Sequence, residues 1–116
     1  MDVKVKVNMS NFYDAIGDIP KVVEKEANQI VGEFCEDVVR NAKLRVPVDT
    51  GRLKWSIRHM LGKRSTHTIE AGADHASYVE YGTSKMKAQP YLRPAINVYL
   101  PKVRSKLANI LNGKKF

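Results

Sequence analysis

The chain has one cysteine among its 116 residues, so no disulfide can form within it. Cys35 falls among Ile30, Val31, Phe34 and Val38 at helical spacing, which predicts that it packs as a small hydrophobic side chain. The fold therefore depends on an apolar core and not on a disulfide framework.

Long apolar runs are missing as well. No segment of about 18 residues is hydrophobic enough to cross a bilayer, and residues 1–6 alternate valine with charge where a secretory signal would be continuously apolar. Hydrophobic residues at 43% and charged residues at 28% are ordinary for a globular protein. We therefore expect a single domain over residues 1–116 that folds in a cytoplasm and has no membrane partner.

Acidic residues are absent from the last third of the chain. All 12 lie at or before Glu80, and residues 1–80 carry no net charge, so the excess of +8 belongs to the remainder. The basic residues there are Lys85, Lys87, Arg93, Lys102, Arg104, Lys106, Lys114 and Lys115. Such a segment indicates either a nucleic-acid contact or a docking surface for an acidic protein.

The first half of the chain predicts a strand and a long helix. Apolar and polar residues alternate over residues 3–9, which is the period of a half-buried strand, and Ser10 can cap a short helical turn over residues 10–16. Over residues 20–45 apolar side chains recur at steps of three and four, which predicts the strongest helix of the chain. Pro47 ends it.

The second half predicts a hairpin and another helix. Residues 53–60 alternate as a strand, residues 62–66 form a turn, and residues 68–72 form the returning strand. One helical turn over residues 75–81, ended by Gly82, precedes an exposed loop over residues 84–90.

Apolar spacing then predicts a second long helix over about residues 91–111, with a kink or break at Pro101. Together these elements predict an α+β fold in which the helix of residues 20–45 covers a small antiparallel sheet of three to four strands. The second helix packs either on this core or on a neighbouring subunit.

The sequence Asp49-Thr50-Gly51 matches the signature of aspartic proteases, which act as dimers when each chain carries one copy. Arg52 follows where those enzymes place a small residue, and two helices do not suit their all-β fold. A structural turn accounts better for Pro47, Asp49, Thr50 and Gly51, with Gly51 supplying a positive φ.

The sequence gives little support for a metal site, a catalytic pair or a phosphate-binding loop. His59, His67 and His75 are spaced eight apart without a second ligand at zinc spacing, and Asp74-His75 lacks a nucleophile to activate. None of the seven glycines falls in a phosphate-binding pattern. We therefore expect no catalytic residues, no cofactor and no metal site.

A small basic nucleic-acid-binding module is the main alternative. Its phosphate contacts would come from the carboxy-terminal cations, with Tyr91 or Tyr99 stacking on bases. These cations do not share one helical face, and no helix-turn-helix pattern accompanies them.

Three phrases stand in order along the chain: AKLRVPVDTGRLKWSI at residues 42–57, YVEYGT at residues 78–83 and MKAQPYLRPA at residues 86–95. Together they resemble the siphophage neck and tail-component family of the "gene product ten" type. Trp55 is bulkier than the residue expected there, and Pro101 is unusual inside the last helix.

The resemblance implies a non-enzymatic α+β subunit of the head-to-tail connector, acting in neck assembly or tail completion. It implies a homo-oligomeric ring of roughly six or twelve copies, with phage head connector and tail proteins as partners and DNA passing through without specific binding. The location would be the virion neck or tail end, after assembly in the host cytoplasm.

Two sets of contact residues follow from this interpretation. The loop over residues 84–90 has no core of its own, which suits it either to contact another subunit or to serve only as a mobile connector. The expected subunit or partner contacts are Met86, Gln89, Pro90, Tyr91, Leu92 and Arg93. The basic segment is expected to dock an acidic partner through Lys102, Arg104 and Lys106.

Overall fold

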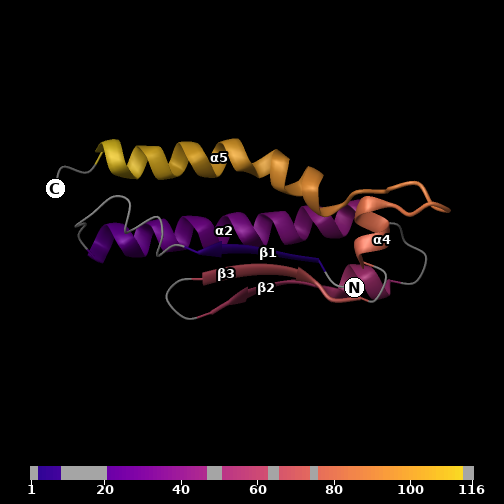
Figure 1. Ribbon diagram of the computed structural model, residues 1–116. Coiled ribbons are helices and arrows are strands. Elements are labelled where there is room, and N and C mark those ends of the chain that lie inside the picture. The colour runs from indigo at the N-terminus through magenta and orange to yellow at the C-terminus, as the bar shows by residue number, and fades with distance from the viewer. Residues whose placement is uncertain (1–2, 9–20, 47–50, 63–65, 74–75, 114–116) are drawn as a thin grey trace.

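A computed structural model describes residues 3–8, 21–46, 51–62, 66–73 and 76–113. In chain order the elements are β1 (Val3–Asn8), α2 (Lys21–Arg45), α3 (Arg52–Ser56), β2 (Ile57–Leu61), β3 (Thr66–Ala71), α4 (Ala76–Tyr81) and α5 (Leu92–Gly113). Figure 1 shows α5 lying along α2, and α2 lying along the sheet. The predicted α+β class is confirmed, and so are the two long helices.

The strands form one antiparallel sheet in the order β1-β3-β2. The central strand β3 pairs with β1 from Val3 opposite Ala71, and with β2 from Ile57 opposite Ala71. The predicted first strand and the predicted hairpin are thus confirmed. The short turn expected over residues 10–16 lies outside the described residues.

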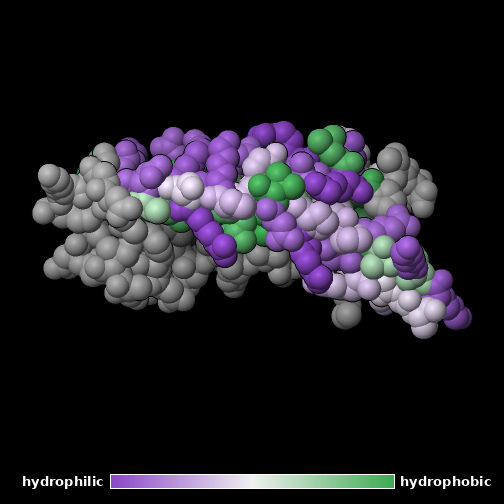
Figure 2. Space-filling view, turned by 90° about the horizontal axis from the view of Figure 1, so that it is seen from above, coloured by the Kyte–Doolittle hydropathy of each residue, from purple (hydrophilic) through white to green (hydrophobic). Residues whose placement is uncertain are grey.

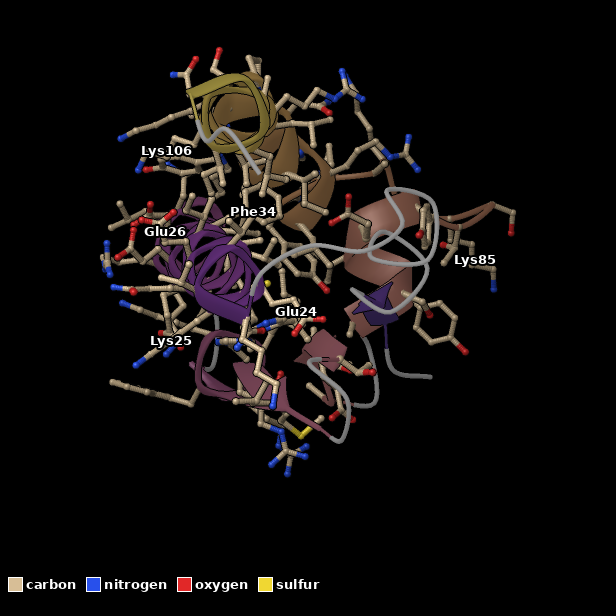
Figure 3. The ribbon with its side chains drawn as sticks, turned by 90° about the vertical axis from the view of Figure 1, so that its left-hand side faces the viewer. Glu24, Lys25, Glu26, Phe34, Lys85 and Lys106 are labelled. Carbon is tan, nitrogen blue, oxygen red and sulfur yellow. The ribbon has the colours of Figure 1, made fainter. Side chains whose placement is uncertain are left out.

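Helix α2 is the central layer, because it is apolar on two sides. Its buried residues Val23, Ala27, Val31, Cys35, Val38, Val39 and Ala42 recur at steps of three, four and one. Viewed end-on, the sheet lies beneath α2 and α5 above it, with Phe34 pointing toward α5 (Figure 3). Phe34 and three residues of α5, Ile96, Tyr99 and Leu107, are partly buried and pack against the core.

The strand predicted over residues 53–60 is wrong in its first half, because residues 52–56 form the single helical turn α3. The Leu53 side chain enters the core while Trp55 stays 75% exposed, so the two do not share a face as they would in a strand. Ser56 Oγ donates a 2.7 Å hydrogen bond to the Leu53 carbonyl, which closes the turn. Alternation over so few residues does not distinguish the two structures.

Helix α5 packs on the chain's own core and runs through Pro101 without a break. Leu92 and Ala95 before the proline and Val103 after it are buried, so burial on α2 offsets the lost backbone hydrogen bond. Figure 1 shows a change of direction along this helix. Within the described parts of the chain, no helix is long and apolar enough to span a membrane.

Candidate assembly surface

The loop between α4 and α5 projects at one end of the molecule, where α3 and α4 also lie (Figure 1). Its backbone closes on itself: the Thr83 amide donates to the Met86 carbonyl at 2.8 Å, and the Met86 amide donates to the Thr83 carbonyl at 3.3 Å. All of residues 83–90 except Ala88 are exposed. The predicted exposed loop is confirmed, and it has an ordered backbone.

Gly82 makes the base of this loop possible. Its φ is +79°, and a Cβ atom at this position would lie 2.8 Å from the Ala88 nitrogen and 3.0 Å from the Met86 oxygen. The two arms of the loop approach so closely that only glycine fits. Beside Gly82, the backbone amide of Gln89 donates a 2.8 Å hydrogen bond to the Val79 carbonyl.

Glu80 joins the loop to the start of α5 from the inside. It is only 4% exposed, and its Oε1 accepts hydrogen bonds from the amides of Tyr91 at 3.0 Å and Leu92 at 2.8 Å. Its Oε2 accepts a third from the Arg93 amide at 3.1 Å. These amides have no partner inside the helix, and a negative charge suits the positive end of the helix dipole. Glu80 is therefore the N-terminal cap of α5.

Tyr91 completes the buried side of the junction. It is 0% exposed, and its hydroxyl donates a 3.0 Å hydrogen bond to the Ala76 carbonyl. Burial, followed by the nearby Glu80 carboxylate, raises the pKa of Tyr91 above its usual value, so the hydroxyl stays protonated as a donor. The tyrosine ties the beginning of α4 to the beginning of α5.

The expectation that Tyr91 and Leu92 are exposed contacts was wrong, since both are buried in the chain's own core. The Glu80 cap turns the chain inward at this point, and no local pattern in the sequence predicts this cap. The sequence contains both partners, because the carboxylate of Glu80 lies in the second phrase and the amides that it binds lie in the third.

Other residues of the predicted contact set remain at the surface. Met86 is 38% exposed, and Gln89, Pro90 and Arg93 are exposed too. The Arg93 guanidinium lies 5.4 Å from the centre of the Tyr81 ring, a cation–π contact. We call the surface formed by α3, α4 and the loop the loop end. Its exposed large apolar side chains include Trp55, Tyr78, Tyr81 and Met86.

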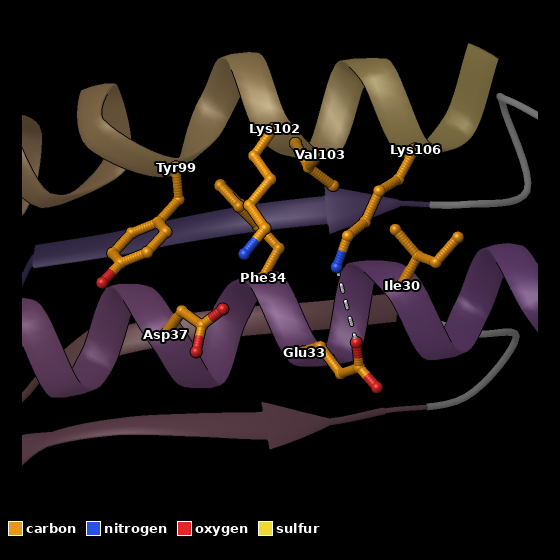
Figure 4. Close-up of a pocket in the computed structure, with 8 residues that line it drawn as sticks. All are labelled: Ile30, Glu33, Phe34, Asp37, Tyr99, Lys102, Val103 and Lys106. Atoms are coloured by element: carbon orange, nitrogen blue, oxygen red, sulfur yellow. Dashed lines mark ion pairs between the residues drawn. The ribbon is translucent and has the colours of Figure 1, made fainter. Parts of the chain in front are cut away.

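The basic docking residues lie on α5, and Lys102, Arg104 and Lys106 are all exposed. Lys102 and Lys106 line a narrow cleft together with Glu33 and Asp37 of α2, and Lys106 Nζ lies 4.0 Å from Glu33 Oε2 (Figure 4). This cleft encloses about 10 Å³, too little for a ligand larger than water. Seen from above, the face of α5 is largely hydrophilic (Figure 2).

A second polar cluster lies between α2 and the hairpin. His59 Nε2 and His67 Nδ1 are 2.9 Å apart, His59 Nδ1 is 2.7 Å from Glu36 Oε1, and His67 Nε2 is 2.7 Å from Asn28 Oδ1. Cys35 Sγ lies within 4.8 Å of one ring nitrogen of each histidine. The linear spacing of the histidines did not predict this grouping.

Burial sets the protonation of this cluster. Desolvation first and His59 second hold the pKa of His67 below its usual value, which favours a neutral ring. Desolvation, followed by the Glu36 carboxylate, raises the pKa of Cys35 to about 12, so its thiol is protonated at neutral pH. In this form Cys35 is not a nucleophile.

Of the predicted structural turn, only the last residue lies in the described part of the chain. Gly51 has a φ of +70°, as expected, whereas Pro47, Asp49 and Thr50 lie outside the described residues. The motif leads directly into the helical turn α3. This arrangement differs from the all-β setting of an aspartic protease.

Comparison with known proteins identifies the family. Residues 10–82, more than half of the chain, match the family model described as "Bacteriophage HK97-gp10, putative tail-component". The match includes the first phrase and all but the last residue of the second, and it ends at Gly82, before the third. No curated protein and no solved structure matches the chain. A family of tail components indicates a structural role in the virion. The chain therefore belongs to the HK97-gp10-like family of bacteriophage tail components.

Proposed function

We propose that this protein is a structural subunit of the phage head-to-tail connector, and that it acts in neck assembly or tail completion as one copy in a homo-oligomeric ring. Its partners are further copies of itself, the head connector and tail proteins. DNA passes through the ring without specific binding. The proposal includes no catalytic step and no cofactor.

The loop end is the observation that carries the proposal. Residues 83–90 are held by a closed backbone turn and by the base at Gly82, while almost all their side chains face solvent. An ordered loop without a core loses little conformational freedom on binding, which favours its use as a contact. Exposed aromatic side chains at the same end add the kind of surface that anchors protein interfaces.

Light scattering during gel filtration tests the proposal directly. The purified chain is measured alone and after mixing with the connector and tail-tube proteins of the same phage, and hydrogen exchange of residues 83–90 is compared in the free and assembled states. We expect a ring-sized species and slower exchange in the loop. A chain that stays monomeric with every partner would contradict the proposal.

Two methionines provide a matched pair of variants. Met86 in the loop is 38% exposed and Met60 on β2 is 37% exposed, so the same change alters exposed apolar surface equally. We expect Met86→Glu to weaken assembly by at least about tenfold, because a charge would be desolvated at the contact, and Met60→Glu to leave it unchanged. Equal effects of the two variants would remove the loop from the interface.

The nucleic-acid alternative makes the opposite prediction. A DNA-binding module would bind duplex DNA tightly at physiological salt, and each phosphate contact would add about 0.9 to the slope of log affinity against log salt. We expect weak binding by the isolated chain. A strictly monomeric protein with tight binding and a steep slope would favour the alternative.

A further inference from the structure

The cluster between α2 and the β2–β3 hairpin has no part in the assembly surface. Cys35 comes from α2, His59 from β2 and His67 from β3, and their ligand atoms all lie within 4.8 Å of one another. We propose that these three side chains bind one Zn²⁺ ion, or a metal ion of similar chemistry, which clamps α2 to the hairpin. This revises the expectation, drawn from linear spacing, that the chain has no metal site.

The sheet register explains why the two histidines meet. His59 stands opposite Ile69, and His67 stands opposite Leu61, so the histidines are diagonal neighbours across the hairpin. Both belong to the face of the sheet that α2 covers: His67 is 2% exposed, and the His59 side chain is 10% exposed. Diagonal neighbours on one face are within reach of long side chains.

The distances are close to those of a tetrahedral site. Zinc bonds of about 2.0–2.1 Å to nitrogen and about 2.3 Å to sulfur would place neighbouring ligand atoms roughly 3.3–3.6 Å apart. His59 Nε2 and His67 Nδ1 are 2.9 Å apart, and Cys35 Sγ lies within 4.8 Å of one ring nitrogen of each histidine. Shifts of about one ångström, within the range of side-chain rotation, would bring all three to bonding distance.

The outer partners of the histidines favour a cation between them. The Glu36 carboxylate only accepts hydrogen bonds, so His59 Nδ1 carries a proton, and in the neutral ring Nε2 presents a lone pair. Asn28 Oδ1 is likewise an acceptor, which places the His67 proton on Nε2 and a lone pair on Nδ1. When both rings are neutral, the two lone pairs face each other at 2.9 Å, an arrangement that a shared positive charge stabilises.

The same partners resemble the supporting residues of known metal sites. A carboxylate that accepts from the outer nitrogen of a histidine ligand orients the ring and raises its basicity. An open groove of about 570 Å³, lined by both histidines, Asn28 and Glu36, offers an entry path and a place for water as fourth ligand. One thiolate with two imidazoles suits Zn²⁺ or Co²⁺, whereas Mg²⁺ and Ca²⁺ require oxygen ligands.

Binding involves no change of oxidation state. The Cys35 thiol loses its proton to solvent as the sulfur–metal bond forms, so one proton is released for each ion bound. Both histidines bind as neutral rings through the nitrogens that face each other.

Titration with Co²⁺ is the direct test, because a thiolate ligand gives a charge-transfer band in the near ultraviolet and four-coordinate geometry gives intense bands in the visible. The full-length chain is used without a histidine tag. We expect one Co²⁺ per chain, displacement by Zn²⁺ but not by Mg²⁺, and a higher Tm with either transition metal. X-ray absorption of the zinc form should show one sulfur and three nitrogen or oxygen neighbours.

Variants assign the ligands. Cys35→Ser should abolish the charge-transfer band, and His59→Gln should prevent stoichiometric binding. Glu36→Gln should weaken Co²⁺ binding by about 10- to 100-fold, as removal of an orienting carboxylate does elsewhere. The matched control is Asp37→Asn, which removes the same charge from the adjacent residue of the same groove, where the carboxylate pairs with Arg40.

Absence of any Co²⁺ band in the wild-type protein would overturn the proposal, whatever the variants do. In that case a proton between the two rings, and not a metal ion, would account for their 2.9 Å contact. A band that survives Cys35→Ser, or equal weakening by Glu36→Gln and Asp37→Asn, would also overturn it. Circular dichroism confirms that each variant is folded.

Discussion

Removal of the Glu80 carboxylate is the sharpest test of how the loop end is built. Glu80→Ala removes three hydrogen bonds at once and leaves the amides of Tyr91 and Leu92 buried without partners, while the bond to the Arg93 amide is only part-buried. Each buried donor left unsatisfied costs about 1–3 kcal/mol. We therefore expect Glu80→Ala to lower the free energy of unfolding by about 2–5 kcal/mol.

Glu80→Gln is the conservative companion. Its amide oxygen can still accept from Tyr91 and Leu92, but its NH₂ group meets the Arg93 amide, donor against donor, and the charge at the helix N-terminus is lost. The expected loss is about 1–2 kcal/mol. The order wild type, Gln, Ala therefore distinguishes a cap from a merely buried side chain.

Urea unfolding followed by far-ultraviolet circular dichroism measures these values, since Trp55 is too exposed to report on the core. The control is Glu33→Ala, because the Glu33 side chain is 57% exposed and its ion pair with Lys106 spans 4.0 Å. Surface pairs of this kind contribute at most about 1 kcal/mol. If Glu80→Ala destabilised the protein no more than Glu33→Ala, the cap would have no energetic role and our account of the junction would be refuted.

Three further outcomes follow from the structure, each measurable on purified variants. Gly82→Ala should cost about 2–4 kcal/mol in chemical unfolding, because the strain of a positive φ and the overlap with backbone atoms add. At Gly51 the φ is also positive, but a Cβ would meet only the Trp55 ring at an ordinary contact distance of 3.6 Å, so Gly51→Ala should cost about 1–2 kcal/mol; equal losses would contradict this. Tyr91→Phe should cost about 1–2 kcal/mol by the same assay, and no loss would mean that the hydroxyl bond is not stabilising. Charge reversal on α5 should slow joining to an acidic partner, most at low salt, and leave the isolated fold intact, whereas normal joining with leaking DNA would place these residues in the channel. The reversed residues are Lys102, Arg104 and Lys106.

Helix α2, the hairpin and α5 were predictable from sequence, because their signals are local. The apolar spacing of residues 20–45 needs no partner to be recognised, and Pro47 limits the helix by its own geometry. The exposed loop and the positive φ at Gly51 were predictable for the same reason, since glycine and the lack of large apolar residues act on the neighbouring backbone. Family membership also rests on short ordered phrases.

Other features were decided by tertiary structure. Leu53 and Trp55 alternate as in a strand, but the core accepts only one of them, so a helical turn forms. Helix α5 survives Pro101 because α2 supplies a surface on which it is buried.

Glu80 and the histidine cluster are the clearest examples of features that only the tertiary structure decided. The sequence placed Glu80 in one phrase and Tyr91 in another, and it spaced Cys35, His59 and His67 without a metal-binding pattern. Only folding brings the carboxylate to the first amides of α5 and the sulfur to the two imidazoles. Periodicity and turn chemistry depend on neighbours along the chain, whereas capping from another helix and ligand grouping depend on distances that only the packed elements set.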